Sequence, residues 1–215
     1  NAPTTAWVDG RSGSSDITVS EPAPPPPPSG DEDVVEDFNY SSVSAMLSSG
    51  NYIDYEVKGE GNMSIISDGY NGSNAVRSTW PASYSGETRL PLDISDWSGE
   101  WWVEYYFRIG STWSMSNVES WKFMAVVSEG HSWRLEFSNG SDGRGLDQYI
   151  SSPYQYAADA HKSMSELRGT GWHRLRLHFS NSGSGHFDVQ MDDGPVRKMS
   201  FSPQSGTLYY LSPTG

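Results

Sequence analysis

The sequence predicts an all-β protein, a sandwich of two antiparallel sheets. The clearest indication is the stretch 171–194, where apolar and polar residues alternate on each side of a Gly/Ser turn at 180–185. The apolar positions are Leu175, Leu177 and Phe179 before the turn, and Phe187, Val189 and Met191 after it. A period of two gives each strand one apolar and one polar face, so this stretch predicts an antiparallel hairpin on a core. The 22 glycines and 13 prolines also favour short strands and many turns.

The chain is expected to contain three parts. Residues 22–30 read Pro-Ala-Pro-Pro-Pro-Pro-Pro-Ser-Gly and predict a polyproline II spacer that rises about 3.1 Å per residue. Residues 1–21 are interpreted as the remnant of an upstream β module or as a leader, because two strand-like runs flank a turn at 9–13. Residues 31–215 have the length of one β-sandwich.

Short runs of strand-forming residues between turn signals predict the remaining elements. Besides the hairpin, we expect strands at 34–40, 52–58, 63–68, 75–80, 87–91, 100–109, 119–127, 132–137 and 208–211. A helical turn is expected within 41–50 and a short helix within 159–168.

The hairpin also resembles a known family. A Trp that opens a strand, a Gly turn, an alternating strand and the turn Asp193-Gly194 resemble the back-sheet hairpin of the concanavalin A-like lectin and glucanase superfamily. That superfamily includes laminin-G-like modules and polysaccharide lyases. The resemblance implies a concanavalin A-like jelly-roll β-sandwich over 31–215. Jelly rolls of this kind usually close with a strand beside the first one, so we expect either that 207–211 close the sheet or that the sequence is truncated after Gly215 and something else covers the edge. Residues 1–21 resemble the end of an immunoglobulin or fibronectin type III module.

Composition excludes several classes of partner. A net charge of −13 would be repelled by nucleic-acid phosphates, so no nucleic acid is expected. No stretch approaches the ~18 apolar residues of a membrane span, so no membrane insertion is expected. With no cysteine, the chain cannot be a disulfide scaffold, but an extracellular, cell-surface or virion location stays open and is our expectation.

The run 100–109 predicts a candidate sugar-binding face. Its odd-numbered positions are apolar and are expected in the core, whereas the opposite face mixes aromatic rings with both charges. In the resembling jelly rolls the equivalent strand lines the sheet on which sugars lie, and sugar rings suit aromatic and charged side chains. If the strands at 119–127 and 132–137 adjoin it, the candidate glycan-binding residues are Trp102, Glu104, Tyr106, Arg108, Lys122, His131, Arg134 and Glu136. The alternative is that opposite charges merely pair across strands.

The run 121–127 is also expected to alternate between an inward and an outward face. It predicts that Phe123, Ala125 and Val127 point into the core and that Lys122 points outward.

Short motifs give little indication of catalysis. Laminarinase-like glycosidases carry Glu-x-Asp-x-x-Glu, which does not occur in the chain. Alginate-lyase-like enzymes carry Arg-x-Glu-x-Arg, Gln-Ile-His and a Tyr-x-Lys strand, and only Arg134-Leu-Glu136 matches half of the first. Tyr106, His131 and Arg134 remain as a lyase constellation, yet we expect a non-enzyme with no catalytic residue.

The sequence contains two kinds of candidate metal ligand, loop oxygens and histidines. Calcium is the only cofactor considered, with Asp68, Asn71, Asp142 and Asp147 as oxygen ligands on loops, although tight turns use the same residue types. The histidines lack the spacing of a zinc site. His173, His178 and His186 are expected on the surface of the hairpin, away from the sugar-binding face.

These observations favour a non-catalytic glycan-binding or surface-attachment domain of a multidomain extracellular or virion protein, such as a phage fibre or decoration protein. The partners would be a polysaccharide or cell-surface glycan and other subunits of a parent assembly. One alternative is a polysaccharide lyase acting on acidic glycans, with Arg108, Lys122 and Arg134 as its basic groups. The other is a purely structural assembly domain.

Overall fold

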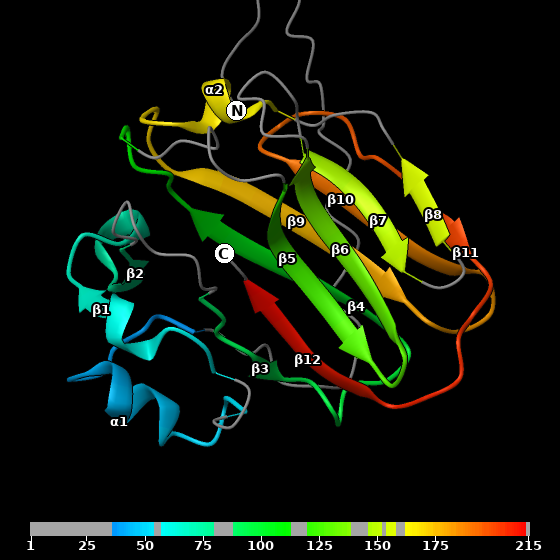
Figure 1. The fold of residues 1–215 in the computed structure, drawn as a ribbon, viewed down its shortest axis with the longest axis horizontal. Helices are drawn as coiled ribbons and strands as arrows, with labels where there is room; N and C mark the ends of the chain where they lie inside the picture. The colour runs from blue at the N-terminus through cyan, green and yellow to red at the C-terminus, as the bar shows by residue number, and fades with distance from the viewer. Residues whose placement is uncertain are drawn as a thin grey trace, which may run out of the picture. The chain divides into compact units, whose positions relative to one another are not determined.

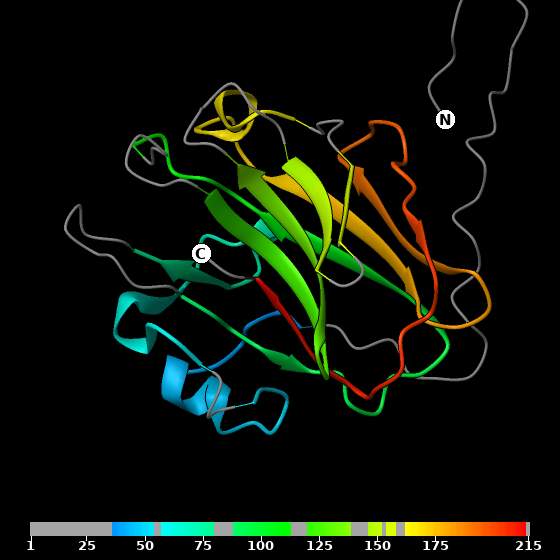
Figure 2. The ribbon, with the colours of Figure 1, turned by 45° about the vertical axis from the view of Figure 1, so that its right-hand side comes forward.

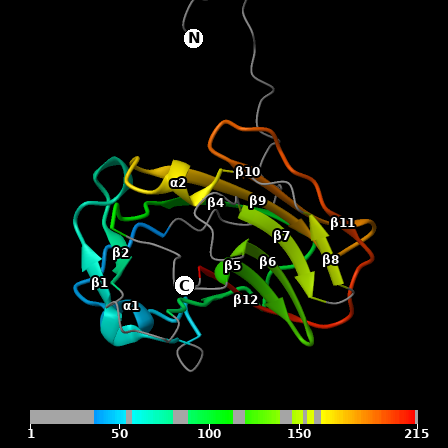
Figure 3. The ribbon, with the colours of Figure 1, turned by 45° about the horizontal axis from the view of Figure 1, so that its top comes forward.

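The computed structural model describes residues 36–53, 57–79, 88–112, 120–138, 146–151, 154–157 and 162–213, all within the compact unit Asp33–Gly215. The predictions for 1–21 and 22–30, and the calcium ligand Asp142, lie outside the described residues. Two antiparallel sheets form two layers (Figure 3), which confirms the predicted jelly-roll β-sandwich. No helix of the described part of the chain is long and apolar enough to span a membrane.

One layer is a four-stranded sheet. Its order is β11 (Ser200–Phe201), β10 (Gly185–Met191), β9 (His173–Ser180) and β4 (Glu100–Phe107). The predicted hairpin is confirmed as β9 and β10, in which Phe187 lies opposite Phe179. Its partner on the other side is β4, where Trp101 lies opposite Phe179.

The other layer is a six-stranded sheet, which crosses in front of β9 and β10 in Figure 2. Its order is β3 (Leu92–Asp93), β12 (Leu208–Pro213), β5 (Ser120–Ser128), β6 (His131–Ser138), β7 (Leu146–Ser151) and β8 (Tyr154–Ala157). The late strand β12, red in Figure 1, runs between β3 and β5. The C-terminal strand is therefore an inner member of this sheet.

A smaller group of elements lies to one side of the sandwich in Figure 1. It comprises α1 (Val43–Leu47), the 3₁₀ turns η2 (Glu60–Asn62) and η3 (Tyr70–Gly72), β1 (Met63–Ile66) and β2 (Ala75–Ser78). A second helix, α2 (Met164–Leu167), falls where the sequence predicts one, as does α1. Met46 and Leu47 of α1 form a separate apolar cluster with Tyr52 and Leu90.

The main core lies between the two layers. The apolar positions predicted for β9 and β10 are all buried, as are Trp101 and Phe107 of β4. Phe179 links the layers, because its ring centroid lies 4.8 Å from that of Trp101 and 4.9 Å from that of Trp133 on β6. Period-two alternation therefore predicts the inward faces of these strands correctly.

The prediction for β5 is correct only at its start, because a β-bulge interrupts the strand. The register with β6 shifts between Lys122 and Met124. Phe123 and Met124 are both buried in the core, and Val126 then faces inward in place of Ala125. A bulge inserts one residue, so every later side chain changes face. The predictions for Ala125 and Val127 are therefore wrong.

Three predicted strands of the N-terminal half are also wrong as continuous strands. Residues 36–40 form no strand, and Phe38 has a φ of 54°. Glu36 holds this segment instead, accepting hydrogen bonds from the hydroxyls of Tyr40 at 3.0 Å and Tyr52 at 2.9 Å. In the residues of 52–58 and 87–91 that the structure describes, isolated bridges such as Lys58 with Arg89 replace the expected continuous strands.

Candidate functional site

The candidate glycan-binding residues do not form one face, because they belong to different sheets. β4 pairs with β9, so Trp102, Glu104 and Tyr106 lie on the outside of the four-stranded sheet. Lys122, Arg134 and Glu136 lie on β5 and β6 of the six-stranded sheet. The condition that these strands adjoin is not met, since the partner of β4 comes from a part of the chain far downstream.

Side chains on the outside of the four-stranded sheet bind one another. Glu104 accepts a hydrogen bond of 2.8 Å from Arg176 and one of 2.6 Å from the hydroxyl of Tyr106. The Tyr106 ring also stacks on Tyr70 of η3, with 3.8 Å between centroids. The charge pairing that the sequence left as an alternative is thus what this face contains.

Protonation on this face follows from those contacts. Partial burial by itself raises the pKa of Glu104, but hydrogen bonds from Tyr106 and Arg176 outweigh it and hold the pKa below its ordinary value. Burial and the neighbouring Glu104 carboxylate raise the pKa of Tyr106 to about 12. At neutral pH Tyr106 is therefore a neutral phenol and a poor proton acceptor.

The remaining predicted site residues are Arg108 and the candidate calcium ligands. Arg108 pairs with Asp68 at 2.8 Å and lies over the Trp172 ring at 5.0 Å. Asn71 sits in η3 with a φ of 52°. Asp147 is not a loop residue but lies in β7, buried on the other sheet. A calcium ion stays a prediction for the loop at 68–74.

The outer face of the six-stranded sheet gathers a different set of groups. A row of four residues crosses four neighbouring strands, each residue directly opposite the next. From β12 to β7 they are Ser212, Ala125, Arg134 and Tyr149. Directly opposed residues share a face, and the alternate residue Leu135 is in the core. This row therefore points away from the core. The guanidinium of Arg134 lies 4.3 Å from the centre of the Tyr149 ring.

A second pair of an arginine and a tyrosine borders this row. Tyr210 lies beside Ser212 on the same face of β12, opposite Val127. Arg89 Nη1 donates a hydrogen bond of 3.0 Å to the Tyr210 hydroxyl, and its guanidinium lies 5.7 Å from the ring centre. We call the following residues the Arg134 face: Arg89, Lys122, Ala125, Arg134, Glu136, Asp147, Tyr149, Tyr210 and Ser212.

Two residues of the Arg134 face are small and buried, and one N–H group of Arg134 has no hydrogen-bond acceptor among the described residues. Ala125 is only 5% exposed and Ser212 is fully buried. Arg134 Nε is also buried and has no hydrogen-bond acceptor among the residues that the structure describes. A buried donor without an acceptor is costly to the folded state.

The lyase constellation expected from the sequence is not assembled. Tyr106 lies on the other sheet. His131 is two residues from Trp133 on β6, so both point to the same face, and Trp133 is in the core. His131 therefore lies on the opposite face of β6 from Arg134. The sequence analysis missed Arg89, Tyr149 and Tyr210 as site residues. Tyr149 lies in Leu-Asp-Gln-Tyr-Ile-Ser at 146–151, which does not alternate between apolar and polar residues, so no strand was expected there.

Comparison with known proteins gives structural relatives only. No protein-family model and no curated protein sequence matches the chain. An alginate lyase mutant in complex with an alginate tetrasaccharide aligns with a TM-score of 0.56 at 13% identity, covering 82% of this chain and 83% of that one. Another mutant of that lyase, with an alginate trisaccharide, gives 0.55 at 13% identity, covering 84% and 86%. An endo-β-1,4-glucuronan lyase from the fungus Trichoderma reesei gives 0.47 at 13% identity, covering 71% and 73%.

These relatives correct two predictions. The sequence led us to expect a non-catalytic attachment domain and a non-enzyme, whereas the solved structures similar to this chain are polysaccharide lyases. The comparison supports the alternative, a lyase acting on acidic glycans. Because identity is 13%, the likeness establishes the fold, and the chemistry must be argued from the side chains.

Proposed function

We propose that this protein is a polysaccharide lyase that cleaves uronate-containing glycans on the Arg134 face. The observation that carries the proposal is the placement of two arginine–tyrosine pairs, Arg134 with Tyr149 and Arg89 with Tyr210, beside a floor of small residues. Since such glycans are polymers outside cells, we also propose an extracellular location.

The reaction requires three things of the protein. A cation or hydrogen-bond donor must neutralise the uronate carboxylate, so that the C5 proton becomes acidic. A base then removes that proton, the bond from C4 to the glycosidic oxygen breaks, and a C4–C5 double bond forms. The leaving oxygen finally takes up a proton from an acid.

Arg134 is suited to bind the uronate carboxylate. A guanidinium matches a carboxylate in shape and charge and donates to it through two N–H groups. Its Nε–H is buried and lacks an acceptor in the described part of the chain. The net charge of −13 would repel a polyanion, so local cations are needed, and on this face Arg89, Lys122 and Arg134 outnumber the carboxylates of Glu136 and Asp147.

Tyr210 is suited to remove the C5 proton. Arg89 lies at hydrogen-bond distance from its hydroxyl, and a cation there stabilises the negative charge that the oxygen acquires on losing its proton. β12 and β6 are separated by β5 alone, so the backbones that carry Tyr210 and Arg134 are about 10 Å apart. A sugar above Ala125 would lie between them. Tyr149, beneath the guanidinium, is assigned as a positioning residue for Arg134.

The test is an assay for the unsaturated product. Alginate, glucuronan and heparin are incubated with the protein between about pH 5 and 9, and ultraviolet absorbance of the new double bond is followed. We expect activity on at least one of them, and a loss of about 100-fold or more in kcat/KM for Arg134→Ala and for Tyr210→Phe. Tyr106→Phe is the matched control, because it removes a phenol hydroxyl from the other sheet and should leave activity unchanged.

Two outcomes would overturn the proposal. One is the absence of product with all three glycans. The other is wild-type activity in both the Arg134→Ala and the Tyr210→Phe variants, which would place the chemistry elsewhere.

A further inference from the structure

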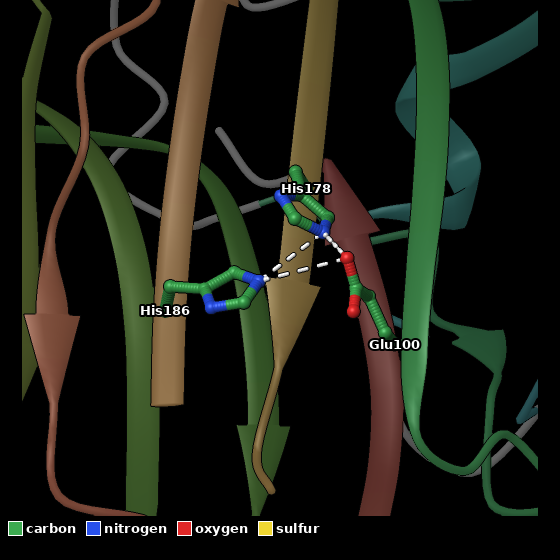
Figure 4. Close-up of side chains that lie close together, drawn as sticks. All are labelled: Glu100, His178 and His186. Carbon is green, nitrogen blue, oxygen red and sulfur yellow. Dashed lines mark hydrogen bonds and ion pairs between the residues drawn. The ribbon is translucent and has the colours of Figure 1, made fainter. Parts of the chain in front are cut away.

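Three side chains with metal-binding atoms converge on the outside of the four-stranded sheet (Figure 4). They are Glu100 of β4, His178 of β9 and His186 of β10. Oε1 of Glu100 lies 2.6 Å from Nε2 of His178, and this Nε2 lies 3.2 Å from Nε2 of His186. The distance from Nε2 of His186 to Oε1 of Glu100 is 4.0 Å.

The sheet register creates this convergence. Glu100 and His186 lie on either side of Ser180, each directly opposite it on a neighbouring strand. His178 is two residues from Ser180 on the same face of β9. The small Ser180 side chain leaves space between its two neighbours. Sequence spacing does not reveal such a site, because the glutamate is 78 residues from the nearer histidine.

The hydrogen bonds on the far side of each imidazole fix which nitrogen faces the cluster with a lone pair. Nδ1 of His178 faces the Asp188 carboxylate at 3.4 Å, and Nδ1 of His186 faces the backbone carbonyl of Ser184 at 3.1 Å. Both partners are acceptors, so each Nδ1 carries the proton in the neutral ring. Both Nε2 lone pairs then face each other and the Glu100 oxygen, and either a proton shared at His178 Nε2 or a metal ion relieves the repulsion between them.

We propose that Glu100, His178 and His186 bind a zinc ion through one carboxylate oxygen and two Nε2 atoms. Zinc bonds of about 2.0–2.2 Å in a tetrahedron place ligand atoms roughly 3.3 Å apart, and the separations of 2.6, 3.2 and 4.0 Å bracket that value. Two imidazoles with one carboxylate suit zinc, whereas calcium prefers oxygen ligands alone.

Two neighbouring residues support the ligands as a metal site requires. Asp188 accepts from Nδ1 of His178 and is itself only 8% exposed, so it orients the ring and raises its strength as a ligand. The indole of Trp102 stacks against the ring of His178. The Glu100 side chain is 57% exposed, against 11% for His178, so the ion would be reached from solvent on the glutamate side.

This zinc site is separate from the proposed lyase site. It lies on the outside of the four-stranded sheet, whereas the Arg134 face belongs to the six-stranded sheet. Its role would be to tie β4 to β10 across β9, so zinc should raise stability and leave lyase activity unchanged. The two proposals therefore stand or fall separately.

The test measures metal binding to tag-free protein from which metals have been removed by a chelator. We expect calorimetry with zinc to show one ion per chain, a rise in the melting temperature that the chelator reverses, and visible absorption of tetrahedral cobalt when cobalt replaces zinc. Calcium should not displace zinc from this site, because the site offers two imidazole nitrogens and one carboxylate. Glu100→Gln and His186→Gln should each weaken zinc binding by at least about tenfold, and Asp188→Asn by about 10- to 100-fold.

His131→Gln is the matched control, because it removes a histidine from the other sheet and should bind zinc as the wild type does. The proposal is overturned if the wild type shows no saturable binding of one zinc ion. It is equally overturned if the double variant His178→Gln/His186→Gln, shown to be folded by circular dichroism, binds zinc as tightly as the wild type.

Discussion

The indole of Trp102 lies flat against the imidazole of His178, with ring centroids 3.9 Å apart and planes 3° apart. The two residues are directly opposite each other on β4 and β9. The sequence analysis assigned them to different surfaces, Trp102 to a sugar platform and His178 to a back hairpin. Their stacking shows that the outside of β4 and the hairpin form one surface, on the sheet that does not carry the Arg134 face.

Removing this stack should cost little stability and no activity. We expect Trp102→Ala to lower the free energy of unfolding by about 1 kcal/mol, because an aromatic pair is worth about 0.5–1.5 kcal/mol and Trp102 is 40% exposed. Trp102→Phe should retain most of the stability that the stack contributes. Urea unfolding measures the change, and a loss of lyase activity in Trp102→Ala would contradict the separation of the two surfaces.

Phe179 should be among the costly positions of the core. It is fully buried and contacts Trp101 of its own sheet and Trp133 of the other. We expect Phe179→Ala to lower the free energy of unfolding by about 3–5 kcal/mol, since it leaves a cavity between the layers. Tyr209→Ala, at a site 41% exposed, is the control and should change stability by no more than about 0.5 kcal/mol. Equal effects in thermal unfolding would be inconsistent with this core.

Gln148 is a polar connection between the layers. It is 2% exposed, and its Nε2 donates to the carbonyl oxygens of Phe187 at 2.6 Å and Arg197 at 3.3 Å. Gln148→Leu should lower the free energy of unfolding by about 1–3 kcal/mol, because it removes a buried donor that two carbonyls share. The same substitution at Gln190, which makes one bond to Gly194 nearer the surface, should cost less. Chemical denaturation of both variants gives the comparison.

Asp192 should contribute stability that depends on pH. Burial by itself raises its pKa, but hydrogen bonds from Lys162, the Arg174 N–H and His173 outweigh this and lower the pKa to about 2. A lowered pKa means that the folded state favours the carboxylate. The contribution is therefore complete above the ordinary value of 3.8 and is lost as the pH falls toward about 2.

Asp192→Asn tests this dependence and tolerates the φ of 49° at this position. We expect a loss of about 1–2 kcal/mol between about pH 5 and 7, after allowance for partial exposure of the site. The difference from the wild type should shrink between about pH 4 and 2. Urea unfolding at several pH values measures it, and a difference that grows on acidification would refute the assignment.

The direction of side chains within a strand could be predicted from the sequence, because that direction is a local property of the extended backbone. Alternation placed Trp101, Phe179 and Phe187 in the core correctly. It failed at Ala125, since a bulge depends on how two strands pair and leaves no clear mark in the sequence.

The sequence by itself determined the sandwich architecture, the hairpin and the inward faces of its regular strands. Only the tertiary structure decided which strands are neighbours, and with that the sites. Arg89 and Tyr210 are 121 residues apart, and Glu100 and His178 are 78 apart, yet both pairs are in contact. Strand pairing is set by burial of the whole core and not by local preference, so it joins residues whose proximity no short motif records.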